Sequence, residues 1–144
     1  MPNDETDTAM LALLAENARM PVATMARKLG LARTTVQARL DKLETNGTID
    51  GYTLRLGAPL RQRLRATVLV SAEPRANAAI LARLKTLQQV EAVHTASGRF
   101  DMIVQLAADT TDELDGVLDQ VGEIKGVRSS ESLIHLSTKI DRRI

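Results

Sequence analysis

Residues 22–52 read VATMARKLGLARTTVQARLDKLETNGTIDGY, and this stretch decides the fold of the first half of the chain. It predicts two short helices, over residues 22–29 and 33–46, that meet at a sharp turn. Gly30 breaks the first helix at that turn. Residues 48–54 then alternate as in a short hairpin, or wing. The stretch as a whole predicts a winged helix-turn-helix.

The second predicted helix has two unlike faces. Val36, Leu40 and Leu43 recur at spacings of four and three residues, which gives one apolar stripe. The opposite face is small, hydrogen-bonding and flanked by basic side chains, which suits the major groove of duplex DNA. We expect base edges to be contacted by Thr34, Thr35, Gln37 and Ala38, and phosphates by Arg33, Arg39 and Lys42. The alternative is an ordinary solvated helix surface.

Individual side chains on this face have more specific expectations. Gln37 can form two hydrogen bonds to adenine, and Ala38 can contact the methyl group of thymine. Arg39 has a competing interpretation, because it could form an ion pair within the chain with an acid such as Glu44 or Asp7.

The composition excludes several classes of protein. The 144 residues contain no cysteine, so disulfides, thiolate nucleophiles and zinc fingers are excluded. One Phe, one Tyr and no Trp leave too few aromatic rings to stack unpaired bases, which argues against a binder of single-stranded nucleic acid. Apolar runs are short and the acidic N-terminus lacks an apolar stretch, so we expect no membrane span, no signal peptide and a cytoplasmic location.

The net charge of +1 is unevenly distributed along the chain. Residues 12–45 contain six basic and three acidic side chains, a net charge of +3. Residues 55–65 add four arginines and no acid, and residues 66–144 contain nine basic and eleven acidic side chains. This distribution fits a nucleic-acid-binding module, residues 1–54, joined by a basic linker to a different domain. The linker arginines alone are equally typical of a solvated surface.

The second half of the chain contains an internal repeat. A shift of 34 residues places the apolar positions of residues 68–93 on those of residues 102–127. Each copy predicts a strand, an amphipathic helix and a strand, so the order is βαββαβ, the ferredoxin-like arrangement. Gly98 suits a tight connection between the copies, and the last strand is expected over residues 133–139. The predicted fold class is therefore α+β, with a ferredoxin-like domain over residues 66–144.

A sheet of this kind has helices on one face only. The other face needs cover, and the simplest cover is the same face of a second copy. We therefore expect a homodimer with two-fold symmetry, which predicts a palindromic site on double-stranded DNA.

Taken together, these motifs resemble the Lrp/AsnC (leucine-responsive, or feast/famine) family of transcriptional regulators. The resemblance implies an N-terminal DNA-reading module and a C-terminal module that binds an amino-acid-type effector and oligomerises, commonly to an octamer. We expect no cofactor. Two positions depart from the family pattern: Ala32 stands where a helix-capping Ser is usual, and Arg99 stands where an acid is usual. The matching segments include Met25–Leu31, Val36–Leu40, Gly47–Ile49 with Gly51–Tyr52, Val90–Val93, Gly98 with Asp101, and Lys125–Val127.

The loop at the repeat boundary is the candidate effector site. An amino acid needs a carboxylate for its ammonium group and donors for its own carboxylate, and Asp101 and Arg99 offer these together with the Gly98 amide. The alternative is that Gly98 only makes the turn and Asp101 only caps it. With the positions that the resemblance adds at the chain's end, the expected effector-binding residues are Ser97, Gly98, Arg99, Asp101, Ser137 and Thr138.

Other functions are less well supported by the sequence. His94 and His135 are the only imidazoles, and without cysteine they predict no metal site. No nucleophile–base pair or phosphate-binding glycine loop is present, so we expect no enzyme; Asp101 with His94 is the one acid/base pair that can be constructed. The remaining alternative is a DNA-organising or scaffold oligomer that does not depend on a ligand.

Overall fold

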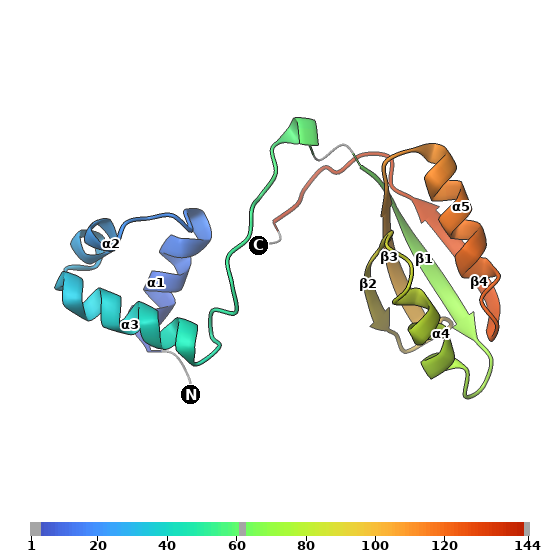
Figure 1. Ribbon diagram of the computed structural model, residues 1–144, viewed down its shortest axis with the longest axis horizontal. Coiled ribbons are helices and arrows are strands. Elements are labelled where there is room, and N and C mark those ends of the chain that lie inside the picture. The colour runs from blue at the N-terminus through green and yellow to red at the C-terminus, as the bar shows by residue number, and fades with distance from the viewer. Residues whose placement is uncertain (1–3, 61–62, 143–144) are drawn as a thin grey trace. The chain divides into compact units, whose positions relative to one another are not determined.

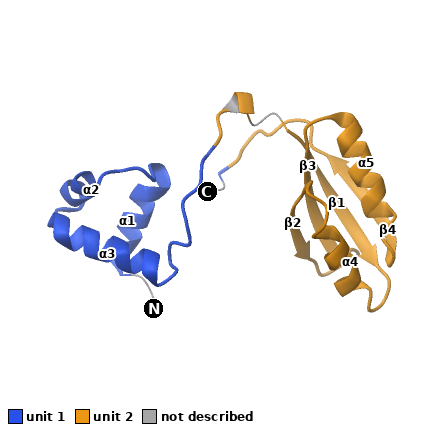
Figure 2. Cartoon of the chain, in the orientation of Figure 1, with its two compact units in different colours: residues 1–55, 142–144 blue, residues 56–141 orange. Residues whose placement is uncertain are grey.

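The computed structural model describes residues 4–60 and 63–142, which divide into two compact units (Figure 2). The first unit runs to Arg55, and the second spans Leu56–Asp141. No helix in these described ranges is long and apolar enough to cross a membrane.

The first unit is a bundle of three helices, α1 (Glu5–Glu16), α2 (Val22–Leu29) and α3 (Arg33–Thr45) (Figure 1). The predicted helix pair is confirmed. Gly30 ends α2 in the left-handed region with φ +66°, and the N–H of Leu31 donates to the carbonyl of Ala26 at 2.9 Å. The buried core consists of Met10, Leu14, Met25, Ala26, Val36 and Leu43.

The hairpin predicted after α3 is wrong. In the described chain, residues 48–57 pair with no strand. The N–H of Ile49 donates to the carbonyl of Leu43 at 2.9 Å, and that of Thr48 donates to the Asn46 side chain at 2.9 Å. Because these N–H groups close the end of α3, they are not available for a strand ladder. The short 3-10 helix η1 (Ala58–Leu60) follows.

The second unit has the predicted βαββαβ order. Its elements are β1 (Leu64–Ala72), α4 (Asn77–Leu84), β2 (Val90–Thr95), β3 (Met102–Ala108), α5 (Thr111–Gly122) and β4 (Val127–Ile134). The strands form one antiparallel sheet in the order β2-β3-β1-β4. Both helices lie on one face of the sheet (Figure 1), where alternate residues of β1 and β3, among them Val68 and Val104, are buried against them. The fold class is confirmed as α+β with a ferredoxin-like domain.

The last strand lies earlier in the chain than the sequence predicts: the prediction over residues 133–139 is wrong except for Leu133 and Ile134, because β4 runs over Val127–Ile134. Its pairing with β1 runs from Ala72–Val127 to Ala66–Ile134, and the His135 N–H then donates to the Arg65 carbonyl at 2.9 Å. The apolar alternation continues beyond this point, but only Arg65 and Leu64 of β1 remain opposite residues 135 and 136, and no residue of β1 lies opposite residues 137–139. Residues 136–139 therefore lie outside the sheet.

Candidate nucleic-acid interface and ligand loop

Helix α3 presents the side chains predicted to contact DNA on its solvent side. Val36 and Leu43 are buried, whereas the four side chains expected at base edges are all exposed, as are Arg33 and Lys42. The Nε2 group of Gln37 donates to Asp41 Oδ1 at 2.7 Å, one turn further along the helix. This bond orients the amide and leaves its oxygen and its second N–H for a partner outside the chain.

Arg39 is engaged within the unit. Its Nη1 donates to Asp4 Oδ2 at 2.6 Å and to Asp7 Oδ1 at 3.2 Å. The hydrogen bond from Arg39 is the main reason that the pKa of Asp4 is lowered, followed by the bond from the Asp7 backbone N–H, and the two acids raise the pKa of Arg39. The ion pair with Asp7 is confirmed. The part played by Asp4 was missed, because an acid at the start of a helix is already explained by capping.

Glu44, the other predicted partner of Arg39, binds Tyr52 instead. The phenol O–H of Tyr52 donates to Glu44 Oε1 at 2.9 Å, which ties the segment after α3 back to that helix. Burial and then the Glu44 carboxylate raise the pKa of Tyr52 above its ordinary value of 10.0. Because the folded-state pKa is the higher one, the bond stabilises the fold below pH ~10 and is lost as the pH rises through the raised pKa.

This raised pKa is directly measurable, because Tyr52 is the only tyrosine and the chain has no tryptophan. In an ultraviolet absorbance titration, the midpoint of phenolate formation by Tyr52 is expected above pH 10.0. Glu44→Gln is expected to lower the midpoint, because a neutral amide no longer disfavours the phenolate. Asp50→Asn, which removes a nearby exposed carboxylate, is the control and is expected to leave it nearly unchanged. A midpoint that is equal in the wild type and in Glu44→Gln would contradict the assignment.

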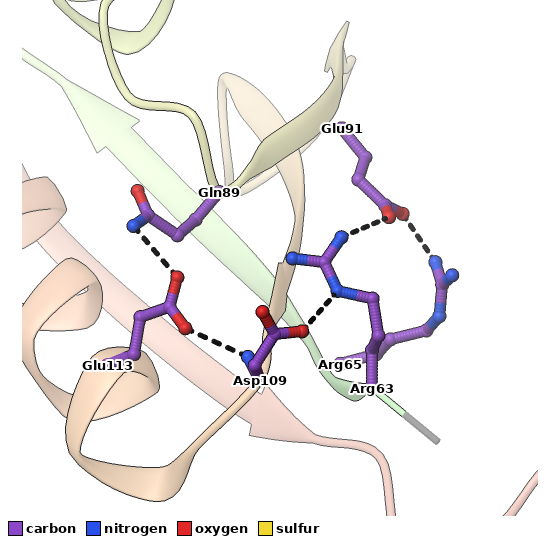
Figure 3. A network of polar contacts seen from close by, with 6 residues as sticks. All are labelled: Arg63, Arg65, Gln89, Glu91, Asp109 and Glu113. Atoms are coloured by element: carbon purple, nitrogen blue, oxygen red, sulfur yellow. Dashed lines mark hydrogen bonds and ion pairs between the residues drawn. The ribbon is translucent and has the colours of Figure 1, made fainter. Parts of the chain in front are cut away.

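The arginines of the predicted basic linker are also bonded within the chain. Arg55 Nη2 donates to the Glu16 carbonyl at 3.3 Å. Arg63 Nε donates to Asp109 Oδ1 at 2.9 Å, and both Arg63 and Arg65 pair with Glu91 (Figure 3). The charges of Arg63 and Arg65 are therefore largely offset by acids of their own unit. Arg61, the fourth arginine, lies outside the described residues.

The start of α5 completes this network. Glu113 accepts hydrogen bonds from Gln89 Nε2 at 3.1 Å and from the Asp109 backbone N–H at 2.9 Å (Figure 3). Thr110 caps the same helix by accepting from the Glu113 N–H at 3.1 Å, while the Glu113 carboxylate reaches to the N–H of Asp109, the residue before the cap. These acids therefore have a structural role at a helix N-terminus. Within the described ranges, no group of three or more acidic or imidazole side chains could hold a metal ion.

Asp101 is held by the backbone of β1. Its Oδ2 accepts from the Ala72 N–H at 2.7 Å, and its own N–H donates to the Val70 carbonyl at 2.8 Å. The carboxylate thus fastens the connection between β2 and β3 to the end of β1. Only Oδ1 remains for a ligand ammonium group. Gly98, in the same connection, has φ +128°, a conformation that L side chains rarely adopt.

Arg99 lies beside an acid that the sequence did not indicate. Its Nη2 is 3.5 Å from Glu131 Oε2, and its guanidinium lies 5.0 Å from the centroid of the Phe100 ring. Arg99 and Glu131 border a hollow of about 300 Å³. Its lining residues are Ser71, Arg99, Phe100, Ser129, Ser130 and Glu131. The register of β1 with β4 brings these serines and Glu131 together, and no local motif marks that register.

The remaining predicted positions lie elsewhere. Ser137 and Thr138 are exposed beyond the end of β4 and do not line this hollow. His135 is also past β4, and its Nε2 lies 2.8 Å from the hydroxyl oxygen of Thr67. His94 is exposed on β2. The structure therefore brings Arg99 together with Glu131, and it does not bring Asp101 together with His94 as an acid/base pair.

Comparisons with known proteins agree on both halves of the chain. Residues 4–44 match the AsnC-type helix-turn-helix domain, and residues 65–144 match the Lrp/AsnC ligand binding domain. The transcriptional regulator LrpA of Pyrococcus horikoshii is 33% identical over 126 residues, which are 86% of this chain and 89% of that protein.

Two solved structures share the fold. AsnC of E. coli superposes with a TM-score of 0.90 at 24% identity, covering 100% of this chain and 99% of that one. A transcriptional regulator of Neisseria meningitidis in complex with L-Met superposes with a TM-score of 0.87 at 23% identity, covering 97% and 94%.

Proposed function

This chain belongs to the Lrp/AsnC family of transcriptional regulators, and from that premise we propose that it reads a palindromic site on duplex DNA as a cytoplasmic homo-oligomer that responds to an amino-acid-type effector. Its relatives are transcriptional regulators, a non-enzymatic family. The observation that carries the DNA-reading half is the exposed face of α3, which lies within a matched helix-turn-helix domain.

The side chains on that face divide by chemistry into two groups. Gln37, oriented by Asp41, reads adenine, and Thr34, Thr35 and Ala38 contact neighbouring base edges. Arg33 and Lys42 bind phosphates, which positions the helix without reading sequence. Arg39 is a weaker phosphate ligand than either, because its charge is already shared with two acids.

Substitution of Gln37 tests this division. After selection of a preferred duplex from a random pool, Gln37→Ala is expected to lose discrimination at one or two base pairs, by roughly 1–3 kcal/mol, with little change on random duplex. Lys42→Ala is the contrasting control, because loss of a phosphate contact weakens all sequences alike and lowers the salt slope by about 1. A Gln37→Ala variant that weakens every duplex equally would rule out base reading by this side chain.

The effector half of the proposal centres on the ligand loop. Arg99 and the Gly98 amide would bind the carboxylate of an amino acid, and Glu131 or the free oxygen of Asp101 would bind its ammonium group. The regulator of Neisseria meningitidis with the same fold was solved in complex with L-Met. Ser97, Ser137 and Thr138, which are exposed, would contact the effector once a second copy of the chain completes the site.

The uncovered face of the sheet supports assembly. It carries the partly exposed Leu69 and Ile103, which lie opposite each other on β1 and β3, and the exposed Leu133 of β4, and no described helix covers this face. We propose that two copies pack through this face and that dimers assemble further to an octamer. Each subunit then contributes one α3 to a palindromic site.

Light-scattering mass and duplex affinity, measured with each of the twenty amino acids, test the effector and the assembly together. A change in mass or affinity with one amino acid supports the sensing regulator. A constant multimer that binds DNA with every amino acid supports the alternative, a DNA organiser that does not depend on a ligand. A multimer with no salt-dependent DNA binding is instead a scaffold.

A further inference from the structure

We propose that Asp4, seated against the DNA-reading helix, competes with DNA phosphate for Arg39 and thereby lowers the affinity of the protein for every duplex sequence alike. The inference rests on the proposed function, because it assumes that α3 lies against DNA. Asp4 is the N-cap residue of α1. The inference therefore gives the start of α1 a role in DNA binding in addition to its role in the three-helix bundle.

The two acids that hold Arg39 are not equivalent. The side chain of Asp7 is 15% exposed, whereas that of Asp4 is 54% exposed. Both accept from the same guanidinium nitrogen, Nη1. The N–H groups on Nε and Nη2 have no partner among the residues that the structure describes. Asp7 is therefore the anchor that keeps the guanidinium beside α3, and Asp4 is the partner that an incoming anion can replace.

The surroundings of this pair suit a phosphate. A hollow of about 560 Å³ lies between the start of α1 and α3, and it is lined by Asp4, Asp7, Thr34, Thr35, Ala38, Arg39 and Lys42. Two hydroxyls, an ammonium and a guanidinium are the donors that proteins use on the DNA backbone. Two carboxylates in the same hollow cancel the charge of Arg39 and Lys42, so a phosphate entering it gains no net attraction.

Loss of the Asp4 charge leaves the hollow with a net positive charge and frees Arg39 for phosphate. Because phosphate contacts carry no base information, this change affects random duplex and the preferred site by the same factor. Asp4 therefore sets total affinity and salt dependence, and the choice between sequences stays with the side chains at base edges.

Asp4→Asn is the test, because asparagine caps a helix as well as aspartate does and so preserves the bond to the Asp7 N–H. We expect about three- to fivefold tighter binding to both random duplex and the selected site at low salt, the scale of one exposed ion pair. The slope of log affinity against log salt is expected to steepen by about 0.9, one added phosphate contact. The matched control is Glu5→Gln, which removes the same charge from the neighbouring exposed residue.

Asp4→Asn is also made in an Arg39→Gln background. This double variant shows whether the tighter binding comes from the release of Arg39 or from the change in net charge. If the competition exists, the gain from Asp4→Asn disappears in that background. A gain that persists there, or a gain in Glu5→Gln of the same size, overturns the inference while leaving DNA reading by α3 intact. If Arg39→Gln does not fold, the salt slopes of the two single variants test the inference: a steeper slope in Asp4→Asn than in Glu5→Gln supports it, and equal slopes overturn it. A wild-type protein that binds no duplex DNA overturns both the inference and the proposed function.

Discussion

Leu43→Ala is expected to unfold the three-helix unit and with it to abolish DNA binding. Leu43 is 1% exposed and lies in the only buried cluster of the described part of this unit. Truncation of a buried leucine to alanine costs about 2–5 kcal/mol. A unit of this length has a total stability of only about 3–8 kcal/mol, so the loss removes most of it.

Circular dichroism with thermal unfolding measures this effect. The variant is expected to lose the helical signal of α1 to α3 and to keep the transition of the second unit, whose core shares no residue with the first. Leu54→Ala is the matched control: Leu54 belongs to the same unit but is 83% exposed, so its truncation is expected to change stability by no more than about 0.5 kcal/mol. Equal stability of Leu43→Ala and the wild type would contradict the described core.

Gly126→Ala is the second large effect, and it falls on the ferredoxin-like unit. Gly126 has φ +101°, and a Cβ added there would lie 2.6 Å from the Cβ of Ala76 and 3.6 Å from Ile80. Backbone strain and overpacking each cost about 1–3 kcal/mol. The residue also accepts a hydrogen bond from the Glu73 N–H at 2.8 Å, so a shift of this turn disturbs the exit from β1 as well.

Two variants separate the causes of this destabilisation. Gly122→Ala is the control, because a Cβ there meets only Ser130 Oγ at 3.7 Å; as the last residue of α5, it is expected to be neutral or to stabilise by up to about 1 kcal/mol. Ala76→Gly combined with Gly126→Ala removes the steric contact and is expected to recover part of the loss, with the strain at φ +101° remaining. Urea unfolding of all four proteins gives the free energies. No difference between Gly126→Ala and Gly122→Ala would refute this account.

Patterns of apolar residues predicted α2, α3 and the order of the elements in the second unit. The spacing of Val36, Leu40 and Leu43 predicted which side of α3 is turned away from solvent, because side chains three and four apart share one side of a helix. The 34-residue repeat likewise predicted the order βαββαβ and hence the antiparallel sheet.

Predictions that depended on a specific partner were less successful. The wing after α3 and the extension of the last strand both looked like strands, but a strand needs an edge to pair with. The N–H groups at the start of the first segment bond back to the end of α3, and from residue 137 the second segment runs past Leu64, where β1 begins. Strand-like alternation is a local property, whereas strand pairing is not.

The sequence by itself therefore determined the two domain types, the helix that faces DNA in the proposed function and the family to which the chain belongs. Only the tertiary structure decided which charges meet: Arg39 with Asp4 across 35 positions, Arg99 with Glu131, and Arg63 and Arg65 with Glu91. The reason is physical. Hydrophobic periodicity repeats every few residues and can be recognised locally, whereas an ion pair depends on a separation of a few ångströms that only the packing of distant segments sets.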